Sequence, residues 1–237
     1  MDGNGRWAVR RGLPVTEGHR VGGTALRRAT EAALDLRISE LTVYAFSTEN
    51  WRREAPEVEG IMELFVELLT REVPDLHEEG VRMRFMGRRA GLSDHVVERM
   101  EWAESTTHDN TSMTLTIAFN YGGRAEIVDA ARAIAADGGV EAITEDSLSG
   151  ALYLPDLRDP DMIIRTAGEQ RTSNFLIWQG AYAELVFTDT LWPDFDIGDL
   201  SAALREYGQR ERRFGGRDAA AIEVAGARER ATGQARA

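Results

Sequence analysis

Short strand-like stretches alternate with longer amphipathic stretches through most of this chain. The short stretches are rich in β-branched and aromatic residues and are bounded by Gly, Asp or Asn, which is typical of strands. Such alternation predicts βα units stacked around a mainly parallel sheet. At 237 residues the chain is long enough for one sizeable core, so we expect a single-domain α/β fold with helices flanking the sheet. Strands are predicted at residues 41–46, 81–86, 113–119, 162–164 and 184–188.

Helices are predicted where apolar residues recur at helical spacing. One begins at Pro56 and continues until Pro74 interrupts it. Ser93 is a candidate cap for a second, and a third spans residues 124–136 until Gly138 and Gly139 stop it. Two further helices fit residues 18–36 and 199–213. We place the globular domain at residues 1–216, and we expect residues 217–237 to form a flexible tail because they hold few large apolar side chains.

Composition excludes several classes of protein. The chain has no cysteine, which excludes disulfides, thiolate metal sites and cysteine nucleophiles. Its net charge of −12 argues against a nucleic-acid partner. Neither a signal peptide nor a long apolar run is apparent, so we expect a cytoplasmic protein with at most peripheral membrane contact.

The chain opens with a glycine-rich segment that suits a diphosphate group. Gly3 and Gly5 let main-chain N–H groups come close to an anion, and Arg6 can clamp phosphate oxygens. Asp2 can hold Mg²⁺, the ion that usually accompanies diphosphate. The same composition is typical of an ordinary turn, so both interpretations stay open on these residues alone.

Four further clusters carry similar chemistry near the predicted strands, where open α/β sheets bind ligands. Residues 47–53 combine polar groups with a tryptophan, and residues 165–174 combine two arginines with hydroxyls that suit a second diphosphate. Glu184 begins a predicted strand and could join Asp2 around a metal, and residues 211–216 form a basic turn. The structural alternatives are capped turns, a solvated glutamate and a favourable helix-dipole contact.

Together these segments resemble the cis-prenyltransferase family, of which undecaprenyl diphosphate synthase is the best-known member. The resemblance runs in order from Met1 to about Arg217, and ordered matches of this length are highly specific. The matching segments are MDGNGRW (1–7), GHRVG (18–22), YAFSTENW (44–51), FNYGGR (119–124), IRTAGEQRTSNFLIWQ (164–179), AYAEL (181–185), LWPDF (191–195) and RERRFGG (210–216).

The resemblance implies a Mg²⁺-dependent transferase that adds isopentenyl diphosphate to an allylic diphosphate, such as farnesyl or geranyl diphosphate, to give Z-polyprenyl diphosphate for carrier-lipid synthesis. It also implies an apolar tunnel between sheet and helices, whose volume sets product length. Candidate wall residues of the tunnel are Ala25, Leu26, Ala29, Ala45, Phe65, Leu69, Leu115 and Phe119.

The resemblance also implies roles for individual residues. The allylic diphosphate would bind at Gly3, Asn4, Gly5, Arg6 and Trp7, with His19 nearby. Isopentenyl diphosphate would bind at Arg165, Arg171, Thr172 and Ser173, and Asp2 and Glu184 would hold Mg²⁺. Asp2 and Asn50 would be catalytic, Asn50 being surrounded by Ser47, Thr48, Glu49, Trp51 and Arg53. In a homodimer, Arg213 would complete the partner's site.

The proton that leaves the condensed product needs an acceptor, and the family pattern gives this role to Asn50. A neutral amide is a very poor base. We therefore expect Asn50 to orient substrate while a diphosphate oxygen accepts the proton.

The chain departs from the family pattern at two places. Val15 stands where most members carry an arginine that contacts the allylic diphosphate, so we expect weaker or altered donor binding. The family's apolar strand before the Asp-Gly-Asn-Gly segment is also missing, which indicates either a start further upstream or a compromised protein. A non-catalytic subunit of the same fold is the main alternative function, and a diphosphate hydrolase ranks after it.

Overall fold

The structure is a computed structural model that describes residues 1–210. The strands are β1 (Glu40–Ser47), β2 (Val81–Met86), β3 (Met113–Tyr121), β4 (Met162–Arg165) and β5 (Glu184–Phe187). The α-helices are α1 (Asn4–Arg10), α2 (Val15–Asp35), α3 (Ala55–Glu78), α4 (Asp94–Thr106), α5 (Gly123–Gly138), α6 (Glu145–Gly150) and α7 (Ile197–Gly208). Short 3₁₀ helices are η1 (Thr48–Arg52), η2 (Val140–Ala142) and η3 (Trp192–Asp194).

All the strand pairs within residues 1–210 are parallel, as the alternation of strands and helices predicts. The larger sheet has the order β1-β3-β2, and β4 pairs with β5 in a separate smaller sheet. Ile117 of β3 pairs with Val43 on one side and with Phe85 on the other. This central position explains the nearly continuous burial of β3, since a parallel strand is covered on both faces.

A cavity separates the two sheets. Among the described residues, β1 pairs only with β3 and β4 pairs only with β5, so each of these two strands keeps one unpaired edge. A space of about 740 Å³ is lined by residues 40–45 from β1 and by residues 161–166 from β4. We call this space the inter-sheet slot.

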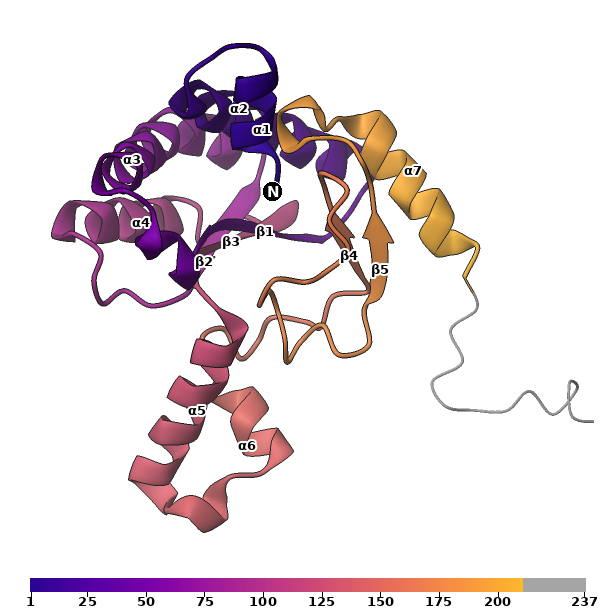
Figure 1. Cartoon of the computed structure of the whole chain (residues 1–237). Coiled ribbons are helices and arrows are strands. Elements are labelled where there is room, and N and C mark those ends of the chain that lie inside the picture. The colour runs from indigo at the N-terminus through magenta and orange to yellow at the C-terminus, as the bar shows by residue number, and fades with distance from the viewer. Residues whose placement is uncertain (211–237) are drawn as a thin grey trace, which may run out of the picture.

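Helices α2, α3 and α4 cover one side of the larger sheet, whereas α5 and α6 project away from it (Figure 1). Phe65 of α3 stacks on Phe119 of β3 with ring centroids 3.9 Å apart, and Phe46 of β1 packs against Phe119 at 5.3 Å. These aromatic contacts tie the helical layer to the sheet. No helix within residues 1–210 has both the length and the apolar character needed to cross a membrane.

Most helices and strands lie close to the places that the local sequence pattern predicts. The strand at residues 81–86 is confirmed, and Ser93 Oγ accepts from Val96 N at the start of α4, as predicted. Gly139, with a φ of 77°, ends α5. The predicted interruption at Pro74 is wrong, because α3 continues to Glu78 with the proline inside it. Residues on both sides of Pro74 are buried, and this burial offsets the hydrogen bond that proline cannot donate.

Other helix boundaries also differ from the prediction. α7 begins at Ile197 because Asp196 Oδ1 accepts from the N–H groups of Gly198 and Asp199, and it ends at Gly208 rather than at residue 213. α2 begins at Val15, before the expected residue 18. Helices α1 and α6 were not predicted from the residues, since each is too short to show a clear period.

Candidate active site

The Asp2 carboxylate lies between two arginines on the lining of the inter-sheet slot. Its Oδ2 accepts a hydrogen bond from Arg165 Nη2 at 2.8 Å, and its Oδ1 lies 3.4 Å from Arg6 Nη2. Burial acts to raise the pKa of Asp2, but Arg165 and then Arg6 lower it below its ordinary value. The side chain stays 36% exposed, so an ionised carboxylate faces the cavity.

The main chain of Asp2 is held from both sides. Asp2 N donates to Thr166 Oγ1 at 2.9 Å, and Thr166 Oγ1 donates to Asp2 O at 3.0 Å. Trp192 N donates to the same carbonyl oxygen at 2.9 Å. Three main-chain hydrogen bonds therefore hold Asp2 in addition to the contacts of its carboxylate.

The glycine-rich opening is the start of α1. Gly3 has a φ of 106°, and a Cβ at this position would lie 2.9 Å from Leu191 Cδ2, so both conformation and space require glycine. Arg6 Nη1 donates to Ala167 O at 2.9 Å and thus faces the loop that follows β4. Gly5 packs towards Val15, the position where the family arginine is missing.

Trp7 has a supporting role in this structure. Its side chain is buried, and its Nε1 donates to Asp194 Oδ1 at 2.7 Å. Arg11 lies over the ring at 4.2 Å from its centroid. Trp7 therefore anchors α1 to η3 and does not line either of the two cavities described here.

Glycines of α2 let α1 come close. A Cβ on Gly18 would lie 2.2 Å from Asn4 O, and a Cβ on Gly22 would lie 2.6 Å from Asn4 Oδ1. Asn4 Oδ1 is buried and has no hydrogen-bond partner among the described residues. The contact between the two helices therefore fixes where Asn4 sits.

We predict that Gly18→Ala lowers the free energy of unfolding by about 1–3 kcal/mol, because the main chain of α1 must move to admit the methyl group. Gly60→Ala in α3 is the matched control, since a Cβ there meets nothing within 4 Å. The free energy of unfolding of the control should rise by about 0.5–1 kcal/mol, because alanine has a better helix propensity than glycine. Urea unfolding measures both values, and equal stability changes in the two variants would contradict the close-contact argument.

Two arginines, one at the end of β4 and one in the loop that follows, lie in different environments. The Arg165 side chain is 17% exposed, whereas that of Arg171 is 62% exposed and pairs with Glu169. Arg165 Nη1 donates to Arg171 O at 3.0 Å, and Arg165 Nε is buried without a partner among residues 1–210. Thr172 and Ser173 line the inter-sheet slot together with Arg165. The end of β4 thus brings Arg165 to the cavity that Asp2 lines, whereas the loop does not bring the Arg171 side chain there.

Ser47 and Asn50 cap η1 reciprocally. Ser47 N donates to Asn50 Oδ1 at 3.0 Å, so the amide oxygen is already engaged. Both residues line the slot. An engaged amide oxygen suits an orienting residue better than a proton acceptor.

The remaining polar residues of this segment hold it in place. Glu49 Oε1 accepts from Asn174 Nδ2 at 2.8 Å, which joins η1 to the loop after β4. Burial acts to raise the pKa of Glu49, but its hydrogen bonds, first that from Asn174, lower it overall. Thr48 Oγ1 donates to Glu49 Oε2 at 3.3 Å, and Trp51 Nε1 donates to Asn120 Oδ1 at 2.8 Å.

Glu57 is a site residue that the sequence analysis missed. Its Oε1 accepts from Arg53 Nη1 at 2.8 Å and lies 3.5 Å from His19 Nε2. Burial, and then the charge of Arg53, lower the pKa of His19, so its imidazole is neutral at pH 7. The spacing of four residues between Arg53 and Glu57 was the available signal.

Within residues 1–210 of one chain, Glu184 does not lie beside Asp2 as a shared metal site would require. It begins β5 and pairs in register with Met162, at the opposite end of the small sheet from Arg165. Three residues along a parallel strand span about 10 Å. Glu184 Oε2 accepts instead from Arg210 Nη1 at 2.7 Å. Among residues 1–210 no three His, Asp or Glu side chains gather as metal ligands, and Arg213 lies outside these residues.

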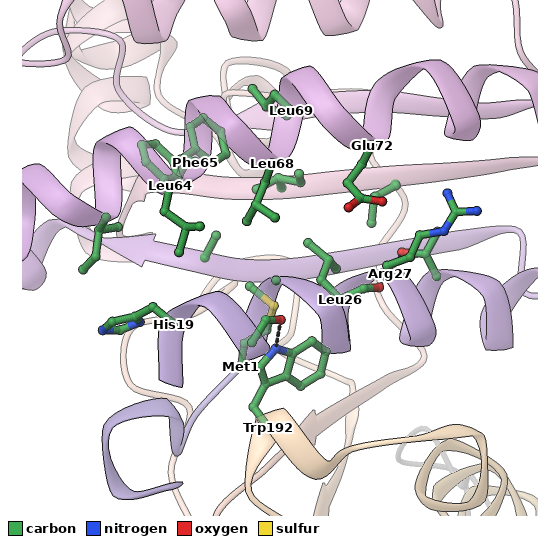
Figure 2. Close-up of a pocket in the computed structure, with 18 of the residues that line it drawn as sticks. Met1, His19, Leu26, Arg27, Leu64, Phe65, Leu68, Leu69, Glu72 and Trp192 are labelled. Atoms are coloured by element: carbon green, nitrogen blue, oxygen red, sulfur yellow. Dashed lines mark hydrogen bonds between the residues drawn. The ribbon is translucent and has the colours of Figure 1, made fainter. Parts of the chain in front are cut away.

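A second cavity of about 110 Å³ is lined by α2, α3 and the larger sheet, as Figure 2 shows. We call it the tunnel. Its lining includes six of the eight expected wall residues, while Ala25 and Ala29 are buried outside it. Asn4, His19 and Trp192 line both the tunnel and the inter-sheet slot, so the polar and apolar spaces meet at these residues. The six lining residues are Leu26, Ala45, Phe65, Leu69, Leu115 and Phe119.

Comparisons with known proteins identify the family of this chain. Residues 1–215 match the family model described as putative undecaprenyl diphosphate synthase. An isoprenyl transferase from Thermotoga maritima is 50% identical over 219 residues, which cover 91% of this chain and 94% of that protein. A trans,polycis-polyprenyl diphosphate synthase from Thermobifida fusca, named as specific for (2Z,6E)-farnesyl diphosphate, is 49% identical over 91% of this chain and 78% of its own.

A solved structure is also similar. Lavandulyl diphosphate synthase from Lavandula x intermedia, in complex with dimethylallyl diphosphate, matches with a TM-score of 0.87 and 35% identity. The match covers 91% of this chain and 95% of that one. The chain therefore belongs to the undecaprenyl diphosphate synthase family, the cis-prenyltransferases, and is a transferase of prenyl groups.

Proposed function

We propose that this protein condenses isopentenyl diphosphate with an allylic diphosphate, farnesyl or geranyl diphosphate, to give a Z-polyprenyl diphosphate for carrier-lipid synthesis. One observation carries the proposal: the cavity that the charged side chains of Asp2 and Arg165 line shares Asn4 and His19 with an apolar tunnel. Such a junction suits a ligand with a diphosphate head and a hydrocarbon tail. The names of the two relatives that mention farnesyl and dimethylallyl diphosphate support an allylic donor.

The donor diphosphate would lie where the two cavities meet. Asn4 and His19 reach this place from α1 and α2, and Arg6 of α1 lies beside Asp2, with Nη2 3.4 Å from Asp2 Oδ1. A neutral His19 offers one N–H donor, and the guanidinium of Arg6 offers positive charge. As the C–O bond of the donor breaks, negative charge grows on the diphosphate, so these groups stabilise the transition state more than the ground state.

Mg²⁺ fits the Asp2 carboxylate. Asp2 is ionised and partly exposed to the cavity, and Mg²⁺ in proteins commonly uses one or two carboxylates together with substrate phosphates. Bound there, Mg²⁺ would supply positive charge that neutralises the departing diphosphate. Asp2 would hold it, while Arg165 and Arg6 keep the carboxylate oriented.

Isopentenyl diphosphate would bind to the loop after β4. Arg165 points to Asp2, and Thr172 and Ser173 line the same space, so a second diphosphate held there would lie next to the first. Fixing both substrates converts an encounter into an intramolecular attack and sets the Z geometry. Asn50 would orient the isopentenyl group, and a diphosphate oxygen would accept the departing proton.

The proposal extends to assembly and location. We propose a cytoplasmic homodimer in which Arg213 of each chain completes the site of the other. The lipid product would give at most peripheral contact with membranes.

Incubation with Mg²⁺, labelled isopentenyl diphosphate and either geranyl or farnesyl diphosphate tests the function directly. Chromatographic sizing should find label in Z-prenyl chains, and omission of the allylic diphosphate or addition of EDTA should abolish incorporation. A well-folded protein that incorporates no label with either donor would contradict the proposal.

A further inference from the structure

The linings that α2 and α3 give to the tunnel both change from largely apolar to charged at its far end. On α2 the lining residues follow one helical stripe that begins at His19 and includes Gly22, Gly23 and Leu26 before it reaches Arg27. His19 and Arg27 are about 12 Å apart along the helix axis. The facing stripe of α3 consists only of Ile, Leu and Phe residues until it reaches Glu72.

Figure 2 shows this polarity along the tunnel: His19 lies at one end, and Arg27 and Glu72 lie at the other. On these two helices only Thr30 and Leu76 lie beyond the charged residues in the lining. A hydrocarbon chain that grows from the diphosphate end therefore meets apolar side chains first and charged groups last.

Arg27 is held in place by carboxylates on both helices. Its Nε donates to Glu31 Oε1 at 2.7 Å, and its Nη2 donates to Glu79 at the end of α3. The Arg27 side chain is 18% exposed, whereas those of Glu31 and Glu79 are 50% and 35% exposed. The Arg27 side chain is thus more shielded from solvent than its two partners.

One nitrogen of the guanidinium has no protein partner. Arg27 Nη1 is buried and makes no hydrogen bond within residues 1–210. A hydrocarbon segment pushed against this group would remove it from any remaining water and give no hydrogen bond in return, which is unfavourable for a charge. Contact with the apolar walls before Arg27, by contrast, stabilises the same segment because it removes apolar surface from water.

From these contacts, and resting on the proposed function, we propose that the Arg27 guanidinium, held by Glu31 and Glu79, is the end wall of the tunnel and limits product length through its charge. A growing chain then stops where further extension would press a methyl or methylene group against the buried cation. The competing explanation is that Arg27 only joins α2 to α3.

Product sizing of two variants separates these explanations. Arg27→Met keeps an unbranched side chain of similar length but removes the charge, and Arg27→Ala removes both charge and bulk. We expect both variants to shift the main product by at least one isoprene unit towards longer chains. Arg20→Ala is the matched control, because Arg20 pairs with Glu17 on the exposed face of the same helix, and its product length should equal that of the parent.

Each result has a definite reading. Unchanged product length in both variants would overturn the proposal and leave Arg27 a structural link, and lengthening by Ala alone would show that bulk and not charge ends the tunnel. Should these two variants fold poorly, Arg27→Gln decides, because it keeps an N–H donor for the two carboxylates while it removes the charge, and it should also lengthen products. A parent protein that makes no product at all would contradict the proposed function instead.

Discussion

Replacement of Asp2 by asparagine is expected to lower kcat about 10²–10³-fold, the effect of removing one group that stabilises transition-state charge. The reason is electrostatic, because the variant keeps the size of the side chain and loses the negative charge that would hold Mg²⁺ against the donor diphosphate. The main chain should stay in place, since Thr166 Oγ1 and Trp192 N are bonded to main-chain atoms of Asp2. Steady-state kinetics at several Mg²⁺ concentrations measure the loss and should show weaker apparent Mg²⁺ binding.

A second aspartate provides the matched control for this experiment. Asp194 accepts from Trp7 Nε1 beside the site but does not line either cavity. Asp194→Asn keeps an acceptor for the indole, so we expect less than about a threefold change in kcat, as for a substitution away from the chemistry. If Asp2→Asn kept kcat within the same range, Asp2 would not carry the proposed role.

The second large effect is expected at Arg165. Arg165→Ala should raise the KM for isopentenyl diphosphate roughly 100-fold, because hydrogen bonds to charged groups contribute about 1.5–3 kcal/mol and Arg165 is largely shielded from water. Arg171→Ala should raise it only a few-fold, since its side chain is 62% exposed and solvent screens its charge. Kinetics with each substrate varied in turn test this order.

Two further readouts separate binding from folding in the Arg165 variants. Arg165→Lys keeps the charge and should recover part of the affinity. Arg165 also lowers the pKa of Asp2, so its removal should move the acidic limb of the pH profile of kcat/KM to higher pH. An equal rise in the KM of both substrates, or an unmoved acidic limb, would contradict the assignment of Arg165.

The sequence located elements well wherever local periodicity decided the outcome. The strand at residues 81–86 and the cap at Ser93 needed only their own side chains. The predicted interruption at Pro74 was wrong because the burial of Val73 and Leu76 outweighs the tendency of proline to end a helix. This burial depends on tertiary contacts that the local sequence does not show. The division into two sheets could not be predicted either, since strand order is a long-range property.

The site was predictable as a set of residues but not as a geometry. The motifs predicted Asp2 and Arg165 as site residues, and in the structure Arg165 Nη2 lies 2.8 Å from Asp2 Oδ2. They did not show that Glu184 pairs with Met162 at the far end of the small sheet, because strand register depends on the fold. Nor did they show that Arg171 faces Glu169 while Arg165 faces the cavity, a difference set by the conformation of one loop.

The inter-sheet slot has a consequence for how this chain behaves among other chains. β1 pairs with β3 along one edge, and residues 40–45 line the slot with no neighbouring strand on the other edge among residues 1–210. Unpaired strand edges are templates for aggregation and domain swapping when another chain can reach them. The free edges of β1 and β4 face a shared cavity, so another chain would have to enter the slot before it could pair with either of them.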